Sequence, residues 1–153
     1  MDPGIAEMGV LRMEDGRIVA ARTYKTPTAG PHPLFEETLE RAAIQAGRVK
    51  SEADEWGAAV VVLEAYEDFG GRYKRGVRNR WMTPLLLGMI AVTVEQPCVW
   101  QGAGAVLTAY GPHKRMWAAG HTGIIEGDEL LGTDHERSAA CHALAYLAPR
   151  KEM

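Results

Sequence analysis

The stretch Met1-Asp2-Pro3-Gly4-Ile5-Ala6-Glu7-Met8-Gly9-Val10 opens the chain, and the rest of the fold is organised around it. Proline fixes its own φ and glycine adopts conformations that other residues avoid, so Pro3-Gly4 predicts a sharp turn. The residue before a proline is pushed into extended geometry. We therefore expect Asp2 at the end of an extended segment, with its carboxylate held where the backbone turns. An ordinary Asp-Pro-Gly turn without a function is the alternative.

Two extended runs follow this turn and flank the pair Asp15-Gly16. The runs cover residues 8–13 and 18–24, and Asp-Gly between two such runs is typical of a β-hairpin. Residues 26–33 contain three prolines and one glycine, which predicts a loop.

Beyond the loop, apolar periodicity predicts alternating helices and strands. Helices are expected over residues 34–49 and 81–95, and over one or two short segments within 106–119, broken at Gly111-Pro112. Short apolar runs predict strands over 58–63 and 98–101, and residues 51–57 and 120–132 are expected to be connections. This order favours an α/β layered fold with a mixed sheet.

The last helix has a clear start signal. Thr133 and Glu136 match a capping box, in which the threonine caps the helix and the glutamate three residues later reaches back. Asp134, Ser138 and His142 follow at four-residue spacing and share a face, with His135 beside them.

Length and composition exclude several classes of protein. The chain has 153 residues, enough for one domain with a sizeable core. No apolar run reaches the roughly 18 residues of a membrane helix, and no secretory signal is recognisable. Cys98 and Cys141 form no C-x-x-C pattern, so we expect both to be reduced and buried, as in a cytoplasmic protein.

Acidic residues stand where this fold would bring them together. Glu64 ends the apolar run 58–63, although Glu67 or Asp68 could take its role, or Glu64 could be an ordinary surface residue. Strand ends and the start of the last helix can converge on one edge of the sheet. Carboxylates with an imidazole are ligands for hard divalent cations. Two such ions about 4 Å apart can activate a water and stabilise the leaving oxygen in phosphodiester hydrolysis.

A basic segment over residues 72–80 contains five basic residues and no acid, although the net charge of the chain is −3. A local basic stripe on an acidic body can steer a polyanion; a solvated loop is the alternative. The candidate DNA-binding residues are those of this segment and of a second, smaller basic cluster: Arg72, Lys74, Arg75, Arg78, Arg80, Lys114 and Arg115.

In the order and spacing of these segments, the chain resembles the RuvC-like Holliday-junction resolvases of the RNase H-like superfamily, and especially their divergent phage-type members. The resemblance is carried by the Asp2-Pro3-Gly4 turn with Gly9-Val10, by the run Val60-Val-Val-Leu-Glu64, and by the helix segment Asp134-His-Glu-Arg-Ser-Ala-Ala-Cys-His-Ala-Leu. It implies one RNase H-like domain over residues 1–153 with a mixed five-stranded sheet flanked by helices. It also implies an endonuclease dependent on Mg²⁺ or Mn²⁺ and a homodimer that places two sites on branched DNA.

The resemblance also implies a set of catalytic and metal-binding residues. Asp2 matches the first family aspartate and Glu64 matches the glutamate after the central strand. The family has two further ligands three residues apart on its last helix, where His135 matches the first and Ser138 stands at the second. Asp134 shares the face of Ser138 and is the candidate to compensate. His135 could instead be a surface residue of the capping turn, and His142 is interpreted as structural.

Two departures from the family pattern lead to further expectations. Serine is a poor Mg²⁺ ligand, so Ser138 predicts a weak metal site, and the alternative function is a protein that binds branched DNA without cutting it. Only Met1 precedes Asp2, where the family has an apolar strand, so we expect either a misassigned start or a truncated first strand. An actin-like phosphotransferase is disfavoured, because the chain is too short for two lobes.

Overall fold

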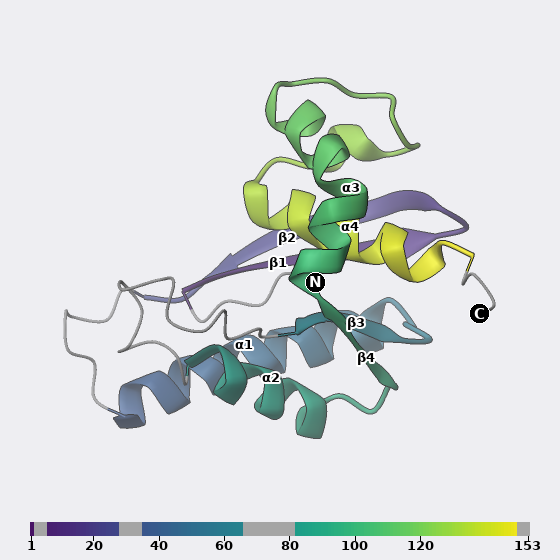
Figure 1. The fold of residues 1–153 in the computed structure, drawn as a ribbon. Helices are drawn as coiled ribbons and strands as arrows, with labels where there is room; N and C mark the ends of the chain where they lie inside the picture. Colours follow the sequence, from purple (N-terminus) through teal and green to yellow (C-terminus); the bar gives the residue numbers. More distant parts are fainter. Residues whose placement is uncertain (2–5, 28–34, 66–81, 150–153) are drawn as a thin grey trace.

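The computed structural model describes Met1 and residues 6–27, 35–65 and 82–149 (Figure 1). Asp2, Glu67, Asp68 and the basic segment 72–80 lie outside the described residues, so the expectations for them stay predictions. None of the described helices combines the length and apolar character needed to cross a membrane.

The predicted hairpin is confirmed. Strands β1 (Glu7–Glu14) and β2 (Arg17–Lys25) pair antiparallel, from Glu7 opposite Lys25 to Glu14 opposite Arg17. Asp15 has φ 49° and Gly16 has φ 80°, and positive φ at both central residues is the geometry that favours Asp-Gly in two-residue hairpin loops. The turn therefore fixes the register next to the loop, and a shift of the pairing between Arg12 and Met13 sets the register over the rest of the hairpin.

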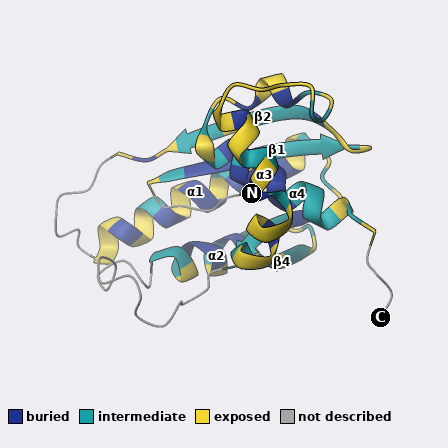
Figure 2. Ribbon diagram, turned by 45° about the horizontal axis from the view of Figure 1, so that its top comes forward, coloured by how far each residue is buried: buried dark blue, intermediate teal, exposed yellow. Residues whose placement is uncertain are grey.

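A second sheet follows. Strands β3 (Val61–Ala65) and β4 (Cys98–Gly102) pair in parallel, with Glu64 opposite Gln101. Helices α1 (Phe35–Glu55) and α2 (Met82–Thr93) pack against each other beside these strands (Figure 1). Buried and exposed residues alternate along α1 in Figure 2, as expected for a helix with one face on the core. The centre of this core contains Met8, Ala46, Leu63, Leu86 and Ile90.

Helices α3 (Ala103–Ala118) and α4 (Asp134–Leu147) pack together, and the short 3₁₀ helix η1 (Asp128–Leu130) lies between them in sequence. A second apolar cluster joins them to β2 and contains Ile18, Val106, Trp117, Leu131, Ala140 and Cys141. Helix α4 also contacts β1 and β3, so it bridges the two sheets. Both cysteines are free; Cys141 is buried and Cys98 is half-buried.

Three predicted boundaries were wrong. Helix α1 continues through 51–55, because Glu52 turns inward and pairs with Arg22 at 2.5 Å, so a residue that looks polar in sequence belongs to the buried face. Strand β3 begins at Val61 instead of Ala58. Helix α3 is continuous through Pro112, which is exposed, and its buried residues Val106 and Trp117 on either side offset the lost hydrogen bond.

The five-stranded sheet is not confirmed, because the described strands form two separate two-stranded sheets. Met1 nevertheless pairs with β3. Its amino nitrogen donates to the carbonyl of Val62 at 2.6 Å, and its carbonyl accepts from the amide of Glu64 at 3.3 Å. These two bonds straddle Leu63, which is the pattern of a parallel ladder. A mixed α/β arrangement is therefore present, with Met1 at the inner edge of the second sheet.

Candidate functional site

The start of helix α4 is anchored to the hairpin, and the predicted capping box is confirmed. The hydroxyl of Thr133 accepts from the amide of Glu136 at 3.2 Å, and the Glu136 carboxylate accepts from the amides of Gly132 and Thr133 at 2.7 and 3.1 Å. The hydroxyl of Thr23 on β2 donates to the same carboxylate at 2.8 Å. These bonds satisfy backbone donors that a helix start leaves open, and they tie α4 to β2.

Gly9 sets how closely α4 lies on β1. A Cβ atom at Gly9 would come within 2.3 Å of the backbone carbonyl of His135 and 2.8 Å of the amide of Glu136. Every other residue would therefore push the helix away from the strand. This close approach also fixes the position of α4 along its own axis, and hence which of its side chains reach β3.

The helix residue that reaches Glu64 is His142. Its Nε2 lies 3.2 Å from a carboxylate oxygen of Glu64, and its Nδ1 lies 3.1 Å from the side-chain amide of Gln101. The imidazole is buried, with 2% of its side chain exposed, whereas 29% of the Glu64 side chain is exposed. The site therefore combines the buried imidazole of His142, held between Gln101 and Glu64, with the partly exposed carboxylate of Glu64.

The amide of Gln101 determines the tautomer of His142. With the amide nitrogen toward α4, Gln101 donates to the carbonyl of His142 at 2.9 Å and to Nδ1 at 3.1 Å, while its oxygen accepts from the amide of Tyr146 at 3.1 Å. Nδ1 is then the acceptor, so the ring proton is on Nε2 and is donated to Glu64. This is an assignment from the hydrogen-bond network.

The residues predicted on α4 have other partners. The carboxylate of Asp134 pairs with the ammonium of Lys114 at 2.9 Å, and the hydroxyl of Ser138 accepts from the same ammonium at 2.7 Å. Nε2 of His135 lies 3.4 Å from the carboxylate of Glu7 on β1. Among the described residues, no three His, Cys, Asp or Glu side chains gather closely enough to hold a metal. Asp134 and His135 thus contact Lys114 and Glu7, and among the described residues they form no metal-binding group with Glu64.

The two predicted basic residues of α3 differ in their surroundings. Lys114 is largely enclosed, with 22% of its side chain exposed, because it bridges to α4. Arg115 is exposed. Of the two, Arg115 is thus the one presented openly to a polyanion, while Lys114 supplies a fixed positive charge one helical turn from His142.

Sequence reasoning missed His142 and Gln101 as members of the site. Gln101 could have been found, because it is the next-to-last residue of β4 and lies opposite Glu64 in the parallel register. Polar residues that end neighbouring parallel strands meet at one edge of a sheet. His142 carried a weaker signal, namely its place on the same helix face as Ser138 and Asp134.

Comparison with known proteins identifies the fold. No family model and no curated protein sequence matches the chain. Among solved structures, T. thermophilus RuvC in complex with Holliday junction substrate superposes with a TM-score of 0.66 and 22% identity, covering 94% of this chain and 87% of that one. The chain has the fold of RuvC. A second structure, described as Thermus thermophilus RuvC, gives a TM-score of 0.63 and 20% identity, covering 94% of this chain and 88% of that one. The resemblance to RuvC expected from the sequence is confirmed at the level of the fold.

Proposed function

We propose that the chain is a metal-dependent endonuclease that cleaves phosphodiester bonds in branched DNA during recombination, repair or phage DNA processing. The observation that carries the proposal is the contact of 3.2 Å between His142 and Glu64, which joins an acid at a strand end to the last helix of a RuvC-like fold. The similar T. thermophilus protein was solved with a Holliday junction substrate, which supports four-way junctions as the substrate class.

The metal ligands that we propose are Asp2, Glu64 and His142, with His142 in the place first predicted for Asp134 or His135. Two carboxylates and one imidazole form a donor set that accepts Mn²⁺ readily and Mg²⁺ through the oxygens. Mg²⁺ or Mn²⁺ bound there would activate a water and stabilise the leaving oxygen. The described residues supply Glu64 and His142, and the proposal therefore depends on Asp2.

Gln101 is proposed as a positioning residue. An amide can present either its nitrogen or its oxygen to Nδ1 of His142. With the nitrogen inward, the ring proton lies on Nε2 and is donated to Glu64. With the oxygen inward, the proton lies on Nδ1 and the lone pair of Nε2 becomes available to a cation on the side of Glu64. Such an outer partner normally fixes the orientation of a metal-binding histidine.

The DNA path is proposed along the basic residues. Arg72, Lys74, Arg75, Arg78 and Arg80 are retained as candidates outside the described residues, and Arg115 is exposed on α3. A homodimer would place two such sites on the two sides of a junction. Sedimentation of the purified protein with and without a four-way junction measures that stoichiometry, and a strictly monomeric complex would contradict the homodimer.

A second candidate function is binding of branched DNA without cleavage, and one observation favours it. The ammonium of Lys114 already bridges Ser138 and Asp134 on the helix face for which the resemblance implied a metal ligand. A fixed side-chain cation there neutralises Asp134 and competes with a second metal ion for that carboxylate. The fold and the DNA-binding surface would then persist while the chemistry is weak.

Incubation with a synthetic four-way junction separates the two candidates. The protein is given Mg²⁺ or Mn²⁺, and a linear duplex of the same sequence serves as the reference substrate. We expect nicking of the junction alone, loss of at least ~100-fold in rate for Glu64→Gln with retained binding, and no change for the exposed control Glu129→Gln. Binding without cutting under either metal favours the second candidate, and failure to bind junctions overturns both.

A further inference from the structure

Lys114 lies on the face of α3 that packs against α4. Tyr110, Lys114 and Trp117 follow one another at spacings of four and three residues, so they share one side of the helix. The hydroxyl of Tyr110 donates to the carbonyl of Leu144 on α4 at 3.4 Å, and Trp117 is buried. A charged residue therefore stands in the middle of a face that is otherwise used for packing.

The ammonium of Lys114 is held at two points of α4. It donates to the hydroxyl of Ser138 at 2.7 Å and pairs with the carboxylate of Asp134 at 2.9 Å. Ser138 is buried and the lysine side chain is largely enclosed, so the position of the ammonium is well defined. An ammonium has three N–H donors. Its two partners among the described residues leave one donor for a further acceptor.

This contact is poorly suited to stabilising the fold. The side chain of Asp134 is 66% exposed, and an ion pair with a largely solvated carboxylate contributes little to stability. The apolar cluster that includes Val106, Trp117 and Ala140 already packs α3 against α4. Stability alone therefore gives little reason for a lysine at this position.

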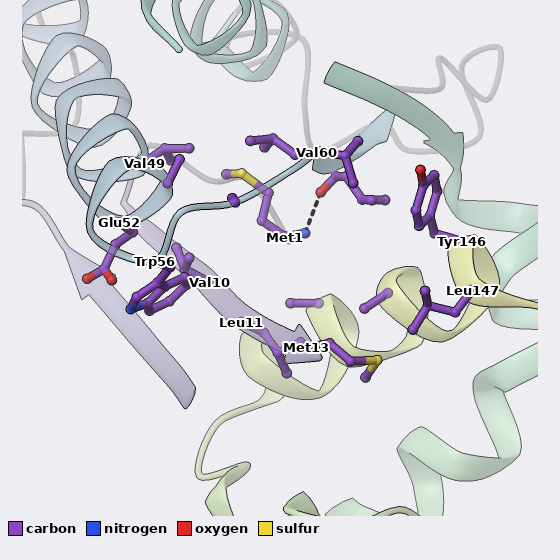
Figure 3. A pocket seen from close by; sticks show the side chains of 16 residues that line it. Met1, Val10, Leu11, Met13, Val49, Glu52, Trp56, Val60, Tyr146 and Leu147 are labelled. Carbon is purple, nitrogen blue, oxygen red and sulfur yellow. Dashed lines mark hydrogen bonds between the residues drawn. The ribbon is translucent and has the colours of Figure 1, made fainter. Parts of the chain in front are cut away.

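Helix α4 presents different faces to the interior and to Lys114. An apolar cavity of about 160 Å³ between the two sheets is lined from α4 by Ala139, Ala143, Tyr146 and Leu147 (Figure 3). Ser138 does not line this cavity and contacts Lys114 of α3 instead. His142, four residues beyond Ser138, shares its face and meets Glu64. The ammonium is therefore next to the face of α4 that carries the candidate site.

We propose that Lys114 is a built-in second cation of the candidate nuclease site. The inference rests on the proposed function and deepens it: the site takes a single divalent ion, and the ammonium of Lys114 contacts a non-bridging oxygen of the scissile phosphodiester. The resemblance implied a metal ligand at the position of Ser138, and there the hydroxyl accepts from the ammonium. The contact that displaces a second ion thus also supplies positive charge.

The surroundings of Lys114 disfavour a second divalent ion. The carboxylate of Asp134 is already paired with the ammonium, and two positive charges at such short range repel each other. The hydroxyl of Ser138 accepts from the same ammonium. The imidazole of His135 lies beside Glu7, with its Nε2 3.4 Å from the carboxylate. Each side chain proposed from the resemblance at this end of α4 thus already contacts another charged group.

An ammonium can take over the electrostatic part of a metal ion's role. Lysine binds phosphate oxygens as a point charge. A positioned cation that meets the charge developing on a phosphoryl group accelerates its transfer. Ser138 and His142 are one helical turn apart, about 6 Å along the axis of α4. A phosphodiester that lies beside His142 and Glu64 is then one turn from the ammonium, which Ser138 and Asp134 hold in place.

Counting bound Mn²⁺ tests the inference without relying on cleavage. Electron paramagnetic resonance of free Mn²⁺ gives the number of ions bound per chain. We expect about one ion on the unmodified chain and about two on the double variant Lys114→Met with Ser138→Asp, which removes the ammonium and adds a carboxylate. Two ions on the unmodified chain, or one on the double variant, would overturn the inference.

The matched control for this count is Lys50→Met with Ser138→Asp. Lys50 also bridges acidic side chains, Asp54 at 2.7 Å and Glu95 at 3.7 Å, but it lies on α1. This variant keeps Lys114, so the added carboxylate has the ammonium as its partner and the count should stay at about one. A second ion on this control would show that Lys114 does not exclude it, which contradicts the inference.

Cleavage of a four-way junction with Mg²⁺ provides the second measurement. Lys114→Met should lower the rate at saturating junction at least ~100-fold while changing the junction Kd by less than about threefold. Lys114→Arg keeps the charge and should recover at least ~10-fold of that rate, and Lys50→Met should cut as the unmodified chain does. A weaker Kd with an unchanged rate at saturation would make Lys114 a DNA anchor and overturn its proposed role.

These outcomes separate the inference from the function on which it rests. An unmodified chain that binds junctions without nicking them contradicts the nuclease, and the Mn²⁺ count still decides whether Lys114 takes the place of a second ion. An unmodified chain that nicks, together with a Lys114→Met chain that nicks equally fast, contradicts only the role of Lys114.

Discussion

His142 on α4 and Glu64 at the end of β3 are 78 positions apart in the sequence, and their side chains meet at 3.2 Å. The contact joins the two sheets through the helix, because α4 also packs on β1. Glu64 and His142 together are therefore a pair of possible metal ligands near the end of β3. Metal binding should therefore respond to changes at this contact and at the interactions that hold it in place.

Replacing His142 with alanine is expected to weaken Mn²⁺ binding at least tenfold, because the imidazole supplies the donor from α4 beside Glu64. Titration calorimetry of the purified protein measures the affinity directly. The exposed His121 provides a matched control, and His121→Ala should bind Mn²⁺ as the unaltered chain does. Equal affinities for the two variants would remove His142 from the site.

Gln101→Leu should lower Mn²⁺ affinity roughly tenfold, since it removes the amide that holds Nδ1 of His142 while it retains similar volume. Gln101→Glu keeps an oxygen acceptor for the Nδ1 proton and should recover most of the affinity. The pattern of loss and recovery distinguishes a positioning residue from a packing residue. If both variants lose affinity equally, the amide does not act through the histidine.

Gly9→Ala should destabilise the protein by about 2 kcal/mol or more, because the new Cβ would overlap the backbone of His135 and shift α4. Urea unfolding measures the loss. Gly47 lies in α1, where an added Cβ atom would have no neighbour within 4 Å, so Gly47→Ala should instead stabilise by up to about 1 kcal/mol. A Gly9→Ala protein as stable as the unaltered chain would contradict the close approach.

Asp128 should make the stability of the fold depend on pH in the acidic range. Burial alone would raise the pKa of its carboxyl group, but hydrogen bonds from the amides of Gly123, Ile124 and Ile125 and from the indole of Trp117 outweigh this effect and hold the pKa below 3.8. A lowered native pKa stabilises the fold above the unfolded pKa of about 3.9, and this contribution is lost as pH falls through the native value.

The Asp128→Asn protein should therefore be less stable than the unaltered chain at pH 7, with the difference shrinking as pH falls below about 4. Urea unfolding followed by tryptophan fluorescence from pH 7 to pH 2 measures both curves. Glu129→Gln, at the exposed neighbouring position, should show no such convergence. A difference that stays constant with pH would mean that the carboxylate charge does not matter.

Arg75→Ala together with Arg78→Ala should weaken junction binding and flatten its dependence on salt by about 2 units in the log–log slope, since each phosphate contact releases close to one counterion. The double replacement Glu36→Gln with Glu40→Gln, on α1, also removes two charges from exposed positions and serves as the control for a change of net charge. Binding measured from low to physiological salt gives the slopes. An unchanged slope in the arginine variant would place the DNA path elsewhere.

Local signals predicted local structure well. The Asp15-Gly16 turn and the Thr133 and Glu136 capping box both form as expected, because each depends on backbone conformation and on neighbours within three residues. Predictions failed where distant contacts decide. Glu52 extends α1 because it pairs with Arg22 on β2, and Pro112 stays within α3 because that helix is packed on α4.

The sequence alone determined that an acid lies near the end of the central apolar strand, because the apolar run that leads into Glu64 brings its carboxylate to the edge of the sheet. It did not determine which residue of α4 meets that acid. With 3.6 residues per turn, His135, Ser138 and His142 all lie on one face of the helix, one or two turns apart. Only the tertiary structure selects His142, because the backbone of His135 rests against Gly9 and sets how far α4 extends toward β3.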